Sequence, residues 1–121
     1  MNCSTQPLRR QLARDLGAVS ESRVAEMLVA SGCKLLARNW RGGGGELDLV
    51  VARGDKVRFV EVKARTGHLA YEPVHGAQVR RLRRAATAWM AAQPECWWTE
   101  ACFVLAQVAP DGRIAWTDDP F

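Results

Sequence analysis

Residues 45–65 read GELDLVVARGDKVRFVEVKAR and contain two apolar segments separated by a short polar one. Residues 47–52 are apolar apart from one acid, and residues 57–64 form a second segment rich in valine. Such β-branched, apolar segments favour strands. The intervening Arg-Gly-Asp-Lys at 53–56 is typical of a hairpin turn. The pattern therefore predicts two adjacent antiparallel strands.

Apolar periodicity outside this hairpin predicts two helices and three more strands. A helix over about 12–31 would bury Val24, Ala25 and Leu28, and Gly32 would end it. A second helix, over about 74–92, carries apolar residues at spacings of three and four. The order helix, three strands, helix, two strands predicts an α/β fold with a mixed central sheet flanked by helices. The further strands are expected at residues 35–40, 101–108 and 113–116, and the four glycines at 42–45 are expected to break regular structure.

The length of 121 residues suits one domain, expected at 12–121, preceded by a flexible tail at 1–11. No apolar run approaches the roughly 18 residues of a membrane span, and the N-terminus lacks a signal-peptide core. We therefore expect a cytoplasmic protein without a membrane partner. The net charge of +4 permits an anionic partner but does not identify one. Four cysteines without a C-x-x-C pair argue against a zinc ribbon or a redox dithiol.

Acidic residues stand at positions where a strand would normally be apolar. Asp48 interrupts the first segment of the hairpin, and Glu46 lies two residues earlier on the same face. In the second segment, Glu61, Lys63 and Arg65 share one face. Each observation has a simpler explanation: an edge aspartate paired with an arginine, or a charged face in solvent.

The hairpin strengthens the case, because it would let Asp48 and Glu61 approach each other. Two close carboxylates repel unless a cation neutralises them, and Mg²⁺ or Mn²⁺ prefers such oxygen ligands. Lys63 would add positive charge beside a reacting phosphate. Glu21 lies on the buried face of the first helix, although a stabilising contact with the helix dipole at its first turn would also explain it. The combination points to metal-assisted phosphodiester hydrolysis.

Four motifs stand out along the chain. They are Glu21-x-x-x-Ala25-x-x-Leu28-x-x-x-Gly32, Leu36-x-x-Asn39-Trp40-Arg41, Gly45-Glu46-Leu47-Asp48-Leu49-Val50 and Phe59-Val60-Glu61-Val62-Lys63-x-Arg65. Together they resemble the YraN-like family of small bacterial proteins, over roughly residues 12–92. The resemblance implies a restriction-endonuclease-like fold with a PD-(D/E)xK site, similar in outline to that of archaeal Holliday-junction resolvases, which act as dimers. In the YraN-like family the second helix usually opens with a lysine, whereas Gln78 stands near that position here.

The resemblance also implies roles for individual residues. Asp48 and Glu61 would be metal ligands and, with Lys63, the catalytic residues. Glu21 and the backbone carbonyl of Val62 would complete a shell for Mg²⁺ or Mn²⁺, with Glu46 as a secondary candidate. The expected activity is metal-dependent endonucleolytic cleavage of DNA, branched or single-stranded, by a chain that can form a homodimer.

Arginines supply candidate contacts to nucleic acid. Arg80 and Arg84 lie four residues apart on the second helix, flanking its buried stripe. Arg41 and Arg65 stand beside the two acidic motifs. Such residues bind phosphates without reading sequence, although a solvated helix face explains the second-helix pair equally well. Two other functions stay open: a catalytically silent nucleic-acid-binding protein of the same fold, and an interaction protein whose acids form ion pairs.

Overall fold

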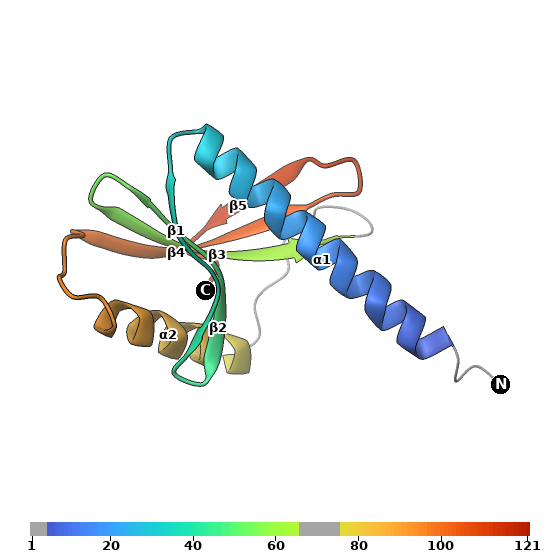
Figure 1. Ribbon diagram of the computed structural model, residues 1–121, viewed down its shortest axis with the longest axis horizontal. Helices are drawn as coiled ribbons and strands as arrows, with labels where there is room; N and C mark the ends of the chain where they lie inside the picture. The colour runs from blue at the N-terminus through green and yellow to red at the C-terminus, as the bar shows by residue number, and fades with distance from the viewer. Residues whose placement is uncertain (1–4, 66–75) are drawn as a thin grey trace.

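The computed structural model describes residues 5–65 and 76–121, and it confirms the expected α/β order (Figure 1). Two helices and five strands follow each other as helix, three strands, helix, two strands. In chain order they are α1 (Thr5–Ala30), β1 (Lys34–Gly42), β2 (Gly45–Arg53), β3 (Lys56–Ala64), α2 (Gly76–Ala91), β4 (Glu100–Val108) and β5 (Ile114–Asp118).

The five strands form one mixed sheet in the order β1-β2-β3-β4-β5. Strand β3 pairs with β4 in parallel, and the other neighbours are antiparallel. The parallel pair requires a crossover between β3 and β4, and α2 lies within that connection. The predicted hairpin is confirmed, because Ala52 pairs with Val57 and Arg53 with Lys56 around a two-residue turn.

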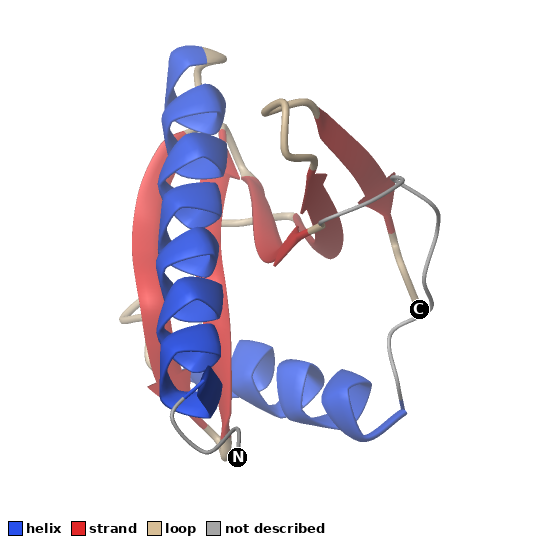
Figure 2. Cartoon of the chain, turned by 90° about the vertical axis from the view of Figure 1, so that its right-hand side faces the viewer, coloured by secondary structure: helices blue, strands red, loops and turns tan. Residues whose placement is uncertain are grey.

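The sheet separates two apolar clusters, one under each helix (Figure 2). Val24 and Ala25 of α1 pack with Leu49 and Val51 of β2. Val50, between those two strand residues, points to the other face and packs with Trp89 of α2. Strand β2 therefore contributes to both clusters, as its nearly continuous apolar sequence requires.

Helix α1 begins at Thr5, so the expectation of a flexible tail through residue 11 is wrong for residues 5–11. The apolar pattern had indicated a helix only from Leu12. Leu8, Leu12 and Leu16 are 61%, 59% and 41% exposed, so they do not continue the buried stripe of Val24. The residues in this segment are nevertheless mostly strong helix formers, which explains its conformation.

The four glycines at 42–45 do not break the sheet as expected. Gly42 and Gly45 pair as the ends of β1 and β2, and Gly43 and Gly44 form the turn at positive φ. This hairpin end rests directly on α2. A Cβ added at Gly45 would lie 2.4 Å from the carbonyl oxygen of Arg81, and one at Gly43 would lie 2.6 Å from that of Arg84. Glycine is needed here for close packing of backbone on backbone.

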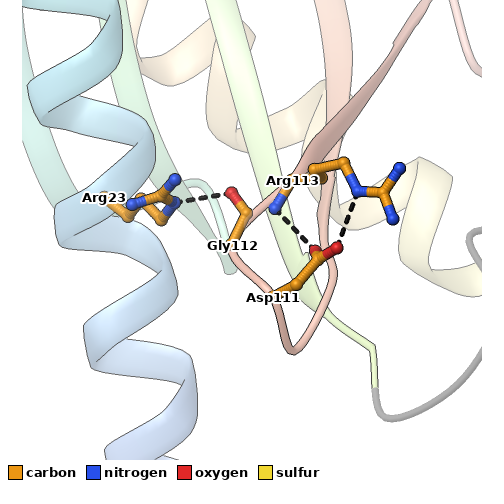
Figure 3. A network of polar contacts seen from close by, with 4 residues as sticks. All are labelled: Arg23, Asp111, Gly112 and Arg113. Atoms are coloured by element: carbon orange, nitrogen blue, oxygen red, sulfur yellow. Dashed lines mark hydrogen bonds and ion pairs between the residues drawn. The ribbon is translucent and has the colours of Figure 1, made fainter.

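Arg23 joins α1 to the turn between β4 and β5 (Figure 3). Its Nε donates a 2.6 Å hydrogen bond to the carbonyl oxygen of Gly112. Within the turn, Asp111 accepts hydrogen bonds from the backbone N–H of Arg113 at 3.0 Å and from its Nε at 2.6 Å. The turn expected at 110–112 is confirmed, and it fixes the C-terminal half of α1 against the sheet. In the part of the chain that the structure describes, neither helix has an apolar stretch able to cross a membrane.

Replacing Gly45 by alanine is expected to destabilise the protein. The added methyl group would meet the backbone of α2, so the hairpin end or the helix must shift, at a cost of about 1–3 kcal/mol. Gly17→Ala is the matched control, because nothing lies within 4 Å of its added Cβ in α1. There the change should raise the free energy of unfolding by about 0.5–1 kcal/mol. Urea denaturation measures both, and equal effects would contradict the packing argument.

Candidate functional site

Strands β2 and β3 stop pairing where they reach two acidic residues, Asp48 and Glu61. Their pairing ends at Leu49 and Val60, and the next pair in the same register would be Asp48 and Glu61. In place of a backbone partner, the N–H of Val62 donates a 2.8 Å hydrogen bond to Oδ2 of Asp48. The structure thus brings together the two acids that the predicted hairpin would allow to approach each other.

Both carboxyl groups are protonated more readily than usual. Burial raises the pKa of Asp48, while the hydrogen bond from Val62 opposes that rise. Burial and then the negative charge of Asp48 raise the pKa of Glu61 to about 8. A hydrogen bond between the two side chains lowers the pKa of Asp48 and raises that of Glu61. Burial and mutual repulsion therefore favour a proton on this pair of carboxyl groups.

One oxygen of Glu61 receives two donors. Lys63 Nζ lies 3.3 Å from Glu61 Oε1, and Nε2 of Gln78 donates to the same atom at 3.1 Å. Gln78 comes from the first turn and a half of α2, so the helix fixes the orientation of a strand side chain. Sequence reasoning had recorded Gln78 only as a departure from the family pattern. Its place at the start of the helix that follows the acidic strand was the available signal.

Glu21 reaches the same region from α1. Its side chain is 18% exposed, and its pKa is raised, first by burial and then by the charge of Asp48. Arg38 lies 4.0 Å from it. The alternative explanation through the helix dipole is wrong, since α1 begins at Thr5 and Glu21 is far from its first turn.

Asn39 links two of the acids and was missed by sequence reasoning. Its φ of 50° is left-handed, a conformation that asparagine adopts more readily than most residues. With Nδ2 turned toward the carboxylates, its amide donates to Glu21 Oε2 at 3.1 Å and to Glu46 Oε1 at 3.3 Å. Glu46 also pairs with Arg41 at 3.3 Å. An asparagine inside a predicted strand was the signal.

The donor set suits a hard divalent cation held by two carboxylates. Among residues 5–65 and 76–121 the acids do not form a ready group of three ligands. However, Mg²⁺ is commonly bound through one or two carboxylates while it keeps several waters. Asp48 and Glu61 fit that requirement, since a cation would relieve the repulsion that raises the pKa of Glu61.

The four arginines proposed as nucleic-acid contacts have different surroundings. Arg65 Nε donates to Oε1 of the buried Gln107 at 2.8 Å, which holds it against the sheet. Arg41 is 82% exposed and paired with Glu46. Arg80 and Arg84 are exposed on α2.

The stability of the metal-free protein is expected to fall as pH rises from about 4.5 to about 8. The raised pKa of Glu61 means that folding favours its neutral form, so the stabilisation is complete below pH 4.5 and lost as the folded group ionises near 8. Thermal unfolding across this range should show a shallower decline for Glu61→Gln than for wild type. The exposed Glu100→Gln serves as the control, and identical slopes for wild type and Glu61→Gln would refute the assignment.

Comparison with known proteins agrees with the resemblance seen in the motifs. The profile of the uncharacterised protein family UPF0102, which is the YraN family, matches residues 20–108. A UPF0102 protein of Dinoroseobacter shibae is 41% identical over 99 residues, which span 81% of this chain and 74% of the relative. Another, of Mycolicibacterium vanbaalenii, is 45% identical over 87 residues, 69% of this chain and 71% of the relative. A third, of Gloeobacter violaceus, is 44% identical over 96 residues, 76% of each chain. The chain therefore belongs to the uncharacterised protein family UPF0102.

Proposed function

We propose that this protein is a divalent-metal-dependent nuclease that cleaves phosphodiester bonds in DNA. The observation that carries the proposal is the buried pair of Asp48 and Glu61, with Lys63 at 3.3 Å from the latter. Buried carboxylates that lie beside each other are costly to a fold and are typical of functional sites. A purely structural ion pair would not need two acids to share one proton.

Each residue of the proposed metal site has its own role. Asp48 and Glu61, with the carbonyl oxygen of Val62, would hold Mg²⁺ or Mn²⁺, and Glu21 would reach the ion through water. Once bound, that ion would supply a polarised water and neutralise charge on the scissile phosphate. Lys63 provides a positive charge beside the phosphate and is oriented by Glu61. Gln78 keeps Glu61 in place.

Cleavage is expected to require both the metal and the acidic pair. Asp48→Asn and Lys63→Met should each reduce the rate at least about 100-fold, because the first removes a charged metal ligand and the second removes the positive charge beside the reacting phosphate. Labelled single-stranded, duplex and branched DNA with Mn²⁺ or Mg²⁺, followed by gel electrophoresis, measures the rates. Glu100→Gln, distant from the acids on β4, should cleave like wild type.

Metal binding is a separate expectation. Titration calorimetry should detect Mn²⁺ binding to wild type and a loss of at least about tenfold in affinity for Asp48→Asn, because loss of a residue that only hydrogen-bonds to a metal ligand already costs about 10–100-fold. Lys63→Met should retain binding. Metal and DNA binding without cleavage by wild type would favour the catalytically silent alternative, and no metal binding would refute the proposed site.

A further inference from the structure

The N-terminal half of α1, residues 5–19, extends past the sheet (Figure 1). We call this segment the arm. The residues by which α1 packs on the sheet, Val24, Ala25 and Leu28, all lie in its other half. The family match begins at residue 20, so the arm precedes the matched region.

The side of α1 that faces the sheet is apolar where the helix packs on the strands but carries arginines in the arm. At 3.6 residues per turn, Arg14 and Arg10 lie seven and eleven residues before Glu21, within about 20° of its direction. Both arginines are exposed. The side that is apolar over the sheet, at Val24 and Ala25, is therefore basic beyond it.

Gly17 lies on this basic side, between the arginines and the candidate site. A Cβ added there would meet no atom of the described residues within 4 Å, the nearby backbone of the helix itself aside. The leucines of the arm are Leu8, Leu12 and Leu16, which repeat at spacings of four. They lie on the side of the helix opposite the two arginines. Asp15 lies with the leucines rather than with the arginines.

We propose that Arg10 and Arg14 form a track for the phosphate backbone of a nucleic-acid strand leading to the candidate metal site. The inference rests on the proposed function. Along the helix, Arg14 lies about 10 Å and Arg10 about 16 Å from Glu21, and the two are about 6 Å apart. A guanidinium group can donate two parallel hydrogen bonds to a phosphate, and such contacts do not depend on the base sequence. The track thus contributes affinity and direction rather than sequence preference.

The test compares two double variants of equal charge change. Arg10→Glu with Arg14→Glu alters the track, while Arg53→Glu with Lys56→Glu alters the β2–β3 turn, at the other end of β2 from the acids. Fluorescence anisotropy with a labelled 20-nucleotide single strand, in Ca²⁺ over a salt series, measures affinity. The track variant should bind at least about tenfold more weakly, with a salt slope smaller by about 1.4 for two lost contacts on a single strand. The control should stay near wild type.

Further measurements distinguish loss of the track from loss of folding and from failure of the proposed nuclease function. Mn²⁺ affinity and the turnover number at saturating DNA should be unchanged in the track variant, while KM rises. Arg10→Gln with Arg14→Gln, checked by circular dichroism for intact helix, should show a smaller loss in the same direction. Equal losses in both double variants, or wild-type binding by the track variant, would overturn the track alone. If wild type binds no DNA at low salt, the proposed function fails with it.

Discussion

The hydrogen bond from the backbone of Val62 to the side chain of Asp48 is the contact on which the candidate site depends. It replaces a strand-to-strand contact at the point where β2 and β3 would otherwise continue as a ladder. A carboxylate that accepts from a backbone N–H is stabilised in its charged form. This bond therefore opposes the rise that burial gives to the pKa of Asp48, while burial and the charge of Asp48 raise the pKa of Glu61 to about 8.

The two helices reach this point because each packs on its own face of the sheet. The cluster under α1 holds Glu21 beside β1 and β2, and the cluster under α2 holds Gln78 beside Glu61. The close approach of Gly45 to the backbone of α2 fixes the distance between that helix and the hairpin end. Packing remote from the acids thus determines which donors meet them.

Local pattern predicted the elements and the central pair well. The two motifs flank a short turn, so the sequence predicted that Asp48 and Glu61 could approach each other, while the register that places them side by side came from the structure. Asn39 and Gln78 were not predicted as site residues, because their contacts join segments far apart in the chain and depend on packing angles. The start of α1 was misplaced for another reason: its apolar side changes direction, and periodicity detects a helix only while one face stays apolar.

The identity of residue 78 bears on how strongly the site attracts a cation. With both acids ionised, Asp48, Glu61 and Lys63 together carry one negative charge, from two carboxylates and one ammonium. In the YraN-like pattern a lysine usually opens the second helix, and at this position it would cancel that charge. Gln78 gives Glu61 a hydrogen bond without adding positive charge. Glu21 is partly buried nearby and pairs with Arg38 at 4.0 Å, so these two charges offset each other and the local balance with both acids ionised stays negative. Under the proposed function, a divalent ion would supply the positive charge that a lysine at this position would otherwise provide, so the acids of this chain would rely on the ion more than those of a chain with lysine there.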